Sequence, residues 1–277
     1  LALLALAIIA FLGQAGPLGW AEHARSQRVA YADLRRDLSA GTVPTGQQID
    51  KDGDGVGDAF VAVGTPLGFL SSPELGLTRE VILEGTTSTV TEKGPGHLRT
   101  SALPGQPGIV TLYGRSWGYG GPFRHVPELR EGAVLTFATG QGTSTYRVRG
   151  TRHAGDTFVA PQVGKGVLTL VTSEGHAFVP TRAVYVDAEL TSTPFAAPTP
   201  VLGAANLSTA EGPLSGDASV WPVLFMMMQA LALVSLALAW ASRRFGGAQA
   251  WLVGVPVIGL LLVLGSREAL RLLPNLL

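Results

Sequence analysis

The sequence GVLTLVTSEGHAF, residues 166–178, decides how the middle of this chain is interpreted. Its first half is a run of Val, Leu and Thr without a helical period, which predicts a buried β-strand over residues 167–171. The run ends in the small polar corner Thr-Ser-Glu-Gly. A strand end that bears a hydroxyl followed by glycine is one way to present a reactive oxygen, so Ser173 is the first candidate for a functional residue.

The residues around this stretch, 60–190, repeat the same pattern. Short runs rich in Val, Ile, Thr, Phe and Tyr alternate with Gly/Pro turns. The runs are FVAVG, VILEG, GIVTLYG, AVLTFAT, STYRVRGTR, GVLTLVT and RAVYVDAEL. No segment between them is a convincing helix. The spacing of the runs therefore predicts an all-β domain, either a barrel or a sandwich.

The composition of the chain excludes several classes of function. Hydrophobic residues occupy 46% of the 277 positions and charged residues 14%, and the mean hydropathy is +0.30, because both ends are almost free of charge. The formal net charge is zero, and no stripe of Lys and Arg interleaved with aromatics indicates nucleic-acid binding. Without any Cys, the chain has no disulfide, no thiol chemistry and no Cys-ligated metal.

Three apolar segments predict a membrane protein. Residues 1–19 begin LALLALAIIAFLG, and we expect a membrane anchor whose start precedes Leu1. The alternative is the remains of a signal peptide, but no A-x-A-like cleavage site comes before Trp20. Residues 220–242 are long enough to cross about 30 Å of hydrocarbon, and residues 250–266 can cross it if their flanks contribute.

The charges beside these segments predict their orientation. Arg243 and Arg244 lie in the short loop 243–249, which the positive-inside rule places in the cytoplasm. The middle region and the tail, residues 267–277, would then lie on the extracytoplasmic side. The tail has leucines opposite arginines, so it is expected either as an amphipathic helix on the outer membrane surface or as a frayed helix end.

Two connecting segments flank the β-region. Residues 20–40 have helix-forming composition and no Pro, which predicts a stalk helix within the segment 20–59. Residues 191–219 are rich in Pro, Thr, Ala and Ser and contain few bulky side chains. We therefore expect a linker between the β-domain and the membrane.

An acidic loop follows the stalk helix. DKDGDGVGDA, residues 50–59, places carboxylates at alternate positions and matches the first nine positions of an EF-hand-type calcium loop. Val61 holds the position of the bidentate Glu, so such a site would borrow a ligand from elsewhere. We expect a structural Ca²⁺ that braces the stalk against the β-domain, with a solvated acidic turn as the alternative. The ligands would be Asp50, Asp52, Asp54, Asp58 and the carbonyl of Val56.

Several motifs in the β-region together resemble the sortase family, most closely the class E type of actinobacteria. VILEGTTSTVTEKGPGHLRTSALPGQPGIV, residues 81–110, looks like the family's approach to its active site, and GYGGPFRHVPELREGAVLTF, residues 118–137, looks like the next loop and strand. LTLVTS, residues 168–173, resembles the strand that ends in the family's TLxTC motif, and RAVYV, residues 182–186, supplies an Arg. The resemblance implies a closed sortase-type β-barrel and the cysteine transpeptidation of a sorting-signal peptide.

The resemblance also implies which residues hold the family's catalytic positions. The Cys falls on Ser173, the His on Arg115 and the oxyanion-stabilising Arg on Arg182. Serine needs a general base, which a guanidinium cannot supply because it stays protonated. Arg115 and Arg182 would both face Ser173 in an anion-attracting pocket. Among the histidines of the domain, His176 is the only candidate for a replacement base, and His97, in a Gly-x-Gly-His element of the family, is expected to be structural.

These differences predict a catalytically inactive, sortase-like membrane protein. Its barrel would be a binding or scaffolding module, and the C-terminal pair of segments would pack against an integral-membrane partner in a membrane or cell-envelope complex. Small and flexible side chains suit such contacts. The candidates in these segments are Gly254, Gly259, Gly265 and the cluster Met226, Met227 and Met228.

Two alternatives stay open at the sequence level. One is a serine-dependent transpeptidase or hydrolase that uses Ser173 as nucleophile and Arg182 as oxyanion donor. The other is a receptor for a peptide or an anionic ligand, held in the old substrate groove by Arg115, Ser173 and Arg182.

Overall fold

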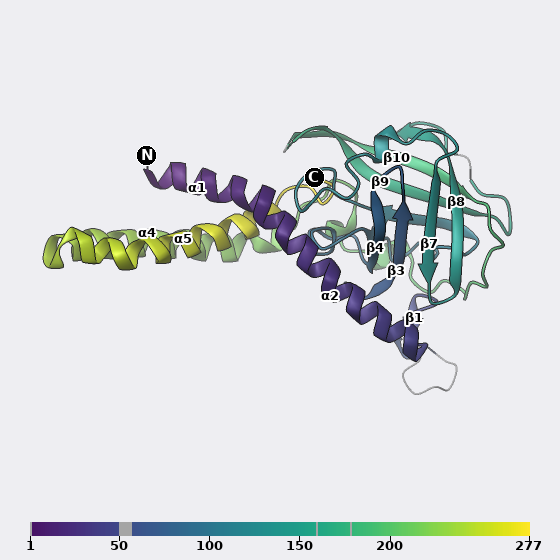
Figure 1. The fold of residues 1–277 in the computed structure, drawn as a ribbon, viewed down its shortest axis with the longest axis horizontal. Helices are drawn as coiled ribbons and strands as arrows, with labels where there is room; N and C mark the ends of the chain where they lie inside the picture. Colours follow the sequence, from purple (N-terminus) through teal and green to yellow (C-terminus); the bar gives the residue numbers. More distant parts are fainter. Residues whose placement is uncertain (1, 50–56, 159, 178) are drawn as a thin grey trace.

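The computed structural model describes residues 2–49, 57–158, 160–177 and 179–277, and it places a β-barrel at one end of long helices (Figure 1). Among these residues the barrel closes in the order β10-β8-β7-β3-β4-β5-β6-β9, with β4–β5 and β6–β9 parallel. The all-β closed barrel with membrane-type helices that the sequence predicts is confirmed. The barrel strands are β3 (Pro66–Ser72), β4 (Leu77–Glu84), β5 (Gly96–His97), β6 (Gly108–Tyr113), β7 (Val134–Thr139), β8 (Gly142–His153), β9 (Gly166–His176) and β10 (Val179–Leu190).

Alternate side chains along the strands point inward, and the apolar ones fill the barrel interior. Leu168 and Leu170 of β9, like Phe137 of β7 and Tyr146 of β8, have no exposed side-chain surface and belong to one apolar cluster. Each fully buried side chain of this size contributes about 1.5–3 kcal/mol. Thr169, which projects the other way from β9, is buried too and donates a hydrogen bond to Asp187. Strand β9 is therefore covered on both faces, as its continuous apolar run predicts.

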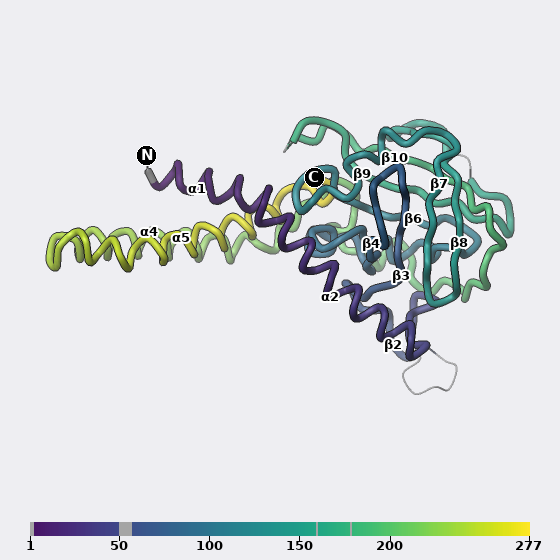
Figure 2. Tube along the Cα trace, in the orientation of Figure 1, coloured from purple at the N-terminus to yellow at the C-terminus, as the bar shows by residue number. Residues whose placement is uncertain are grey.

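The N-terminal helices form one continuous rod that reaches the barrel. α1 (Ala2–Gly13) passes through a π-helical turn, η1 (Gln14–Leu18), into α2 (Gly19–Ala40), which crosses the barrel beside β3 and β4 (Figure 2). Ala30 and Leu34 of α2 pack on apolar side chains of these strands. The Gln27 side chain bonds to both the N–H and the carbonyl of Val81, at 2.7 and 3.1 Å. The expected stalk helix is thus docked along the barrel wall.

The C-terminal helices α4 (Trp221–Phe245) and α5 (Gly247–Arg271) form a hairpin that extends away from the barrel (Figure 1). Together with the N-terminal rod they are the three helices, in the described part of the chain, long and apolar enough to cross a membrane. The N-terminus and the α4–α5 turn lie at the same end, opposite the barrel. The loop 243–249 and the barrel thus lie at opposite ends of the helices, and the side of a membrane on which each would lie stays a prediction.

Two segments differ from what their composition predicts. Residues 191–219 wrap the barrel instead of forming a free linker: Glu211 is 2% exposed and accepts two hydrogen bonds from Arg99, at 2.6 and 2.8 Å. The short helices η3 (Ala204–Asn206), η4 (Thr209–Glu211) and η5 (Ala218–Val220) lie in this segment. Residues 267–271 belong to α5, and the remaining tail turns into the barrel instead of lying on a membrane surface.

The expected strand at residues 60–64 is reduced to β2 (Ala59–Phe60), which pairs with β1 (Gln48–Ile49) outside the barrel. Strand β3, which the sequence patterns did not predict, takes the place between β4 and β7. The remaining short helices are α3 (Ser88–Thr91) and η2 (Val126–Glu128).

Candidate functional site at the end of strand β9

The candidate site lies where the parallel strands β6 and β9 end side by side. Tyr113 pairs with Val171, and the N–H of Gly114 donates to the Val171 carbonyl at 3.0 Å, so the residues after β6 lie beside the end of β9. A Cβ on Gly114 would lie 2.3 Å from the Phe123 ring, so only glycine permits this close packing. The site therefore combines Ser173 from β9 with residues 115–116 from the loop after β6.

Ser173 is buried and its hydroxyl is fully engaged. Ser173 is only 4% exposed. Its Oγ lies 2.9 Å from the Leu276 carbonyl oxygen and 2.6 Å from the Oγ of Ser116. Ser116 also approaches the Leu276 carbonyl, with its N–H at 3.0 Å and its Oγ at 3.2 Å. The hydroxyl protons of Ser116 and Ser173 thus have their acceptors among three oxygen atoms, the two Oγ atoms and the Leu276 carbonyl oxygen.

The Leu276 carbonyl belongs to the last part of the sequence, which occupies the site. Asn275 and Leu276 are completely buried and Leu277 is 2% exposed. The Leu276 side chain packs with Tyr113, Val171 and Ala183. The sequence predicts this tail either as an amphipathic helix at a membrane surface or as a frayed helix end. In the structure Leu276 instead fills an apolar slot of the barrel, which the hydrophobic effect favours.

Arg115 is fully enclosed beside Ser116. Its guanidinium donates to the carbonyl oxygens of Leu277 and Ser88, each at 3.3 Å, and lies 5.1 Å from the ring centre of Tyr119. Burial lowers the pKa of Arg115, while Tyr119 and Glu92 oppose that shift. The guanidinium nevertheless stays protonated in a protein, so Arg115 is a buried cation and not a base.

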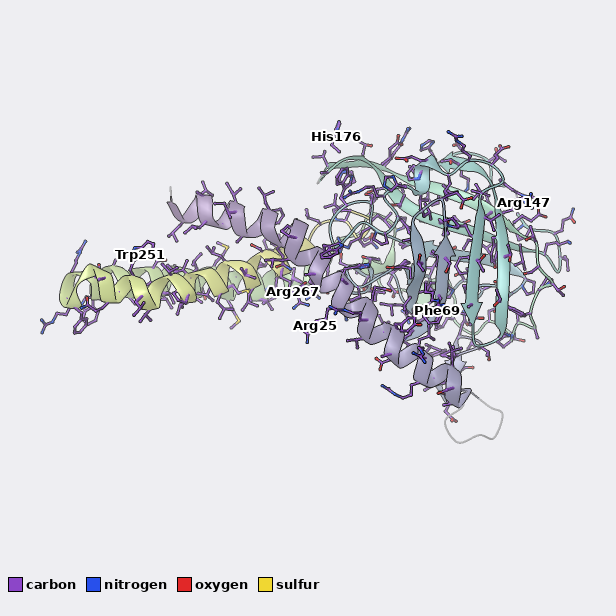
Figure 3. All side chains as sticks on the ribbon, viewed as in Figure 1. Arg25, Phe69, Arg147, His176, Trp251 and Arg267 are labelled. Atoms are coloured by element: carbon purple, nitrogen blue, oxygen red, sulfur yellow. The ribbon has the colours of Figure 1, made fainter. Side chains whose placement is uncertain are left out.

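Glu92 is a buried carboxyl group whose charge acts on Arg115. Burial raises the pKa of Glu92, and the charges of Arg115, Arg267 and Arg271 act in the opposite direction. Arg267, which is labelled near the junction of α5 with the barrel in Figure 3, approaches Glu92 to 3.9 Å. Positive charge from the loop after β6 and from the end of α5 thus converges on one carboxyl group.

Arg182 does not join Ser173. Residues that pair across antiparallel strands project to the same face, and Ala183 is the partner of Ser173 while Arg182 is the partner of Glu174. The Arg182 Nε donates to Glu174 at 2.8 Å, and this hydrogen bond lowers the pKa of the exposed Glu174 carboxyl. The expectation that Arg115 and Arg182 face Ser173 together is therefore wrong for Arg182, and the guanidinium of Arg115 contacts Leu277, Ser88 and Tyr119. His176 is exposed at the tip of the β9–β10 hairpin (Figure 3).

A second buried polar cluster centres on His97, which lies beside Glu84 on the parallel strands β4 and β5. The His97 Nδ1 is 2.9 Å from Glu84, and its Nε2 is 2.9 Å from the Ala102 carbonyl and 3.0 Å from the Ser101 Oγ. Burial lowers the pKa of His97, but the charge and hydrogen bond of Glu84 outweigh it, so the net shift is upward. A protonated ring donates from both nitrogens, which agrees with a structural role and leaves no lone pair for Ser101.

The sequence did not identify Ser116, Glu92 or the tail as parts of the site. A usable signal for the tail was its composition: LLPNLL, residues 272–277, has no charge directly after an arginine-bearing helix end. The calcium ligands Asp50, Asp52, Asp54 and Val56 lie outside the described residues. Of that set the structure describes Asp58, whose N–H donates to the Ile49 carbonyl at 3.0 Å.

Comparisons with known proteins agree with the barrel. A family model for the Sortase domain matches residues 70–191, which include Arg115, Ser173 and Arg182 but not the long helices. None of the curated proteins matches the sequence. The barrel is thus a sortase-like domain within a longer chain.

Solved structures similar to this chain are also sortases. A sortase D5 transpeptidase from Clostridium perfringens is 16% identical, over 61% of this chain and 99% of that one, with a TM-score of 0.46. Sortase E from Streptomyces avermitilis is 28% identical over 55% and 100%, with a TM-score of 0.41. Sortase C from Clostridium perfringens SM101 is 21% identical over 62% and 90%, with a TM-score of 0.42.

Proposed function

We propose that this chain is a sortase-like membrane protein without transpeptidase activity, whose extracytoplasmic barrel serves as a binding or scaffolding subunit of a membrane or cell-envelope complex. The arrangement around Ser173 is the observation on which the proposal rests. The hydroxyl at the cysteine position bonds to Ser116 and to the Leu276 carbonyl. Neither group is a base that can take its proton, and a serine without a base is a weak nucleophile.

The arginines support the same conclusion. Transpeptidation needs positive charge at the oxygen of the attacked carbonyl. Arg182 pairs with Glu174 on the other face of the sheet, and Arg115 donates to two backbone carbonyls of the chain itself. This arrangement weighs against a serine-dependent enzyme that uses Arg182. It also weighs against a receptor in which both arginines hold an anion.

Helices α4 and α5 support the scaffolding part of the proposal. A Cβ on Gly254 would lie 2.7 Å from Leu238, so Gly254 serves the contact between the two helices themselves. A Cβ on Gly259 would meet no described atom within 4 Å, and Met226 and Met228 are each 67% exposed. A glycine with open space beside it and exposed, flexible thioethers on these helices suit the close approach of a partner helix in the membrane.

The loss of activity is tested with the purified chain and a fluorogenic sorting-signal peptide. We expect the rate of cleavage to equal that of the Ser173→Ala variant, because no group activates the hydroxyl. A rate clearly above that of Ser173→Ala would remove the proposal of inactivity.

The scaffolding role is tested by purification of the tagged full chain from native membranes. We expect a membrane protein to co-purify and to be lost in the Gly259→Leu variant, which fills the open face. Gly247→Leu is the matched control, because a side chain there also meets open space, at the α4–α5 turn. Recovery of a lone chain from native membranes would contradict the scaffold.

We also propose that the acidic loop binds a structural Ca²⁺ through Asp50, Asp52, Asp54, Asp58 and the Val56 carbonyl. The alternating carboxylates support it, and so does the Asp58–Ile49 hydrogen bond, which brings the two ends of the loop together. A ligand at 100 times its Kd stabilises the folded chain by about 2.7 kcal/mol, so a chelator should lower the melting temperature. If calorimetry detects no heat of Ca²⁺ binding and the chelator has no effect, the site does not exist.

A further inference from the structure

The tail that occupies the site is joined almost directly to a membrane helix. α5 ends at Arg271, whose guanidinium donates to Asp217 at 2.8 Å and to Glu268 at 2.7 Å. Leu272 follows, Leu273 packs with Tyr119 and Leu270, and residues 275–277 are buried against the barrel, at the end marked C in Figure 2. The position of this tail in the site is therefore fixed by the position of α5 against the barrel.

Asn275 is held by hydrogen bonds that its backbone N–H and its side-chain NH₂ donate to carbonyl oxygens. Its backbone N–H donates to the Ser215 carbonyl at 2.8 Å. Its side-chain NH₂ donates to the carbonyl oxygens of Thr86 and Gly212, at 2.7 and 2.9 Å. Two buried carbonyls require a side chain with two donors, which a carboxamide provides and a carboxylate does not. The site thus distinguishes Asn from Asp at this position.

Leu276 is held by both its carbonyl and its side chain. The carbonyl accepts hydrogen bonds from the N–H and Oγ of Ser116 and faces the Oγ of Ser173. Its side chain is fully buried in the apolar slot with Tyr113, Val171 and Ala183. The slot and the hydroxyl pair thus hold a short peptide segment, which in this structure is the chain's own tail.

We propose that residues 273–277 act as an exchangeable latch, which closes the Ser116–Ser173 site while α5 holds its position and leaves it when the α4–α5 pair shifts. The open site then binds a segment of a partner protein with the same chemistry, an asparagine followed by apolar residues. The latch rests on the proposed binding role of the barrel, because it states what the site binds and what controls access to it.

A small movement of α5 is enough to open the latch. The helix is continuous to Arg271, and Leu272 is the single residue between it and the tail. A helix rises about 1.5 Å per residue, so a shift by one residue along its axis exceeds the tolerance of the hydrogen bonds at Asn275 and Leu276. Any partner that displaces the membrane pair therefore also acts on the site.

An engineered thiol can report whether the site is open, because the chain contains no Cys. In the full-length chain in detergent, Ser173→Cys is treated with a maleimide and compared with the exposed Thr181→Cys. We expect labelling at position 173 to be at least about 100-fold slower, since it requires a local opening. Leu276→Asp, added to Ser173→Cys, should raise that rate at least about 10-fold, because an unpaired carboxylate is disfavoured in the apolar slot.

Ser144→Cys is the control for general unfolding. Ser144 lies on β8, is completely buried and contacts Gly105, so it reports the barrel core and not the tail. Leu276→Asp should leave labelling at position 144 unchanged. A similar rise at both positions would overturn the latch, because the tail would then be an integral part of the barrel. Equal rates at 173 with and without Leu276→Asp would also overturn it.

Exchange is tested by addition of a synthetic peptide, Leu-Leu-Pro-Asn-Leu-Leu, to the Ser173→Cys/Leu276→Asp chain. We expect the peptide to slow labelling at least about 5-fold, and the same peptide with Asp in place of Asn to have no effect. Lack of protection by the first peptide would overturn the exchange of ligands, and protection by both would overturn the recognition of asparagine. These outcomes differ from a failure of the proposed inactivity, which would appear as peptide cleavage by the wild-type chain.

Discussion

Two buried clusters of the barrel, one around His97 and one around Ser173, each bring a serine hydroxyl to polar partners, and their hydrogen-bond partners differ. The cluster at the end of β4 and β5 has a carboxylate, a histidine and Ser101 in hydrogen-bond contact. The cluster at the end of β6 and β9 has Ser173 and Ser116 with a buried arginine next to them. The first has the residue types of a catalytic triad, and the second lies where the resemblance to sortases predicts the active site.

Neither cluster has both the residue types and the geometry that nucleophilic catalysis requires. In the first, the His97 Nε2 is within hydrogen-bond distance of the Ala102 carbonyl, and the Ser101 Oγ accepts from the N–H of Thr111 at 3.1 Å. In the second, the hydroxyls are close to a carbonyl, but the base is missing. The comparison teaches that residue identity locates a polar cluster, whereas the hydrogen-bond partners decide whether it can perform chemistry.

The largest effect is expected from His97→Ala. The change leaves the buried Glu84 carboxylate without its counter-charge. Removal of one partner from a buried ion pair lowers the free energy of unfolding by about 3–5 kcal/mol. Thermal unfolding of the full chain in detergent, followed by circular dichroism, should show a large fall in melting temperature. Ser101→Ala is the control, and its melting temperature should fall much less, because the His97–Glu84 pair stays intact. A His97→Ala chain as stable as wild type would mean that this cluster does not brace the barrel.

Arg115→Ala should have the next largest effect. The change leaves the carbonyl oxygens of Ser88 and Leu277 without their charged donor, and it removes a positive charge that acts on Glu92. We expect the free energy of unfolding to fall by about 2–3 kcal/mol. The same unfolding measurement checks it. Arg115→Ala without loss of stability would show that the arginine is not the structural cation described for the second cluster.

The first cluster should also make stability depend on pH. The pKa of His97 in the folded chain lies above its ordinary value of 6.5, so its contribution is complete below pH 6.5 and is lost as the pH rises through the folded-state pKa. One unit of pKa shift corresponds to about 1.4 kcal/mol. The melting temperature of the wild-type chain should therefore fall as the pH rises above 6.5 and through the folded-state pKa of His97, and it should fall less in Glu84→Gln. Equal pH profiles would contradict the charge assigned to His97.

Arg182→Ala should have the smallest effect. The residue belongs to an exposed ion pair with Glu174, and such pairs contribute little because water and salt screen them. We expect no measurable change in melting temperature or in the labelling rate of Ser173→Cys. A marked change in either would mean that Arg182 acts on the Ser173 site, contrary to the register of β9 and β10.

Local sequence pattern was a good guide to the strands that contain β-branched and aromatic runs. Residues 166–176 and 179–190 became long strands, as their composition predicts. Strand β3 could not be predicted, because PLGFLSS contains Pro, Gly and two Ser, and its hydrogen bonds to β4 and β7 override these preferences. Segment 191–219 has a composition typical of linkers, but individual contacts such as the Arg99–Glu211 ion pair hold it against the barrel. Its composition alone does not reveal these contacts.

Motif order placed Ser173 and Arg115 next to each other, but it did not say which way each side chain points. The register at Arg182 depends on an irregularity between Pro180 and Arg182, which no local pattern reveals. Occupation of the site by Leu276 depends on a contact between residues 103 positions apart in the chain. Such pairings depend on the closed fold as a whole. The composition of residues 272–277 signals an apolar tail, but it does not say which residues the tail contacts.

Reaction of the wild-type chain with a fluorophosphonate probe, followed by mass spectrometry of the peptide that contains Ser173, is the most direct test of the central claim. We expect no adduct on Ser173, because its hydroxyl is bonded to Ser116 and to the Leu276 carbonyl and meets no base. An adduct on Ser173 that is absent from the Ser173→Ala variant would show an activated nucleophile and would contradict the claim.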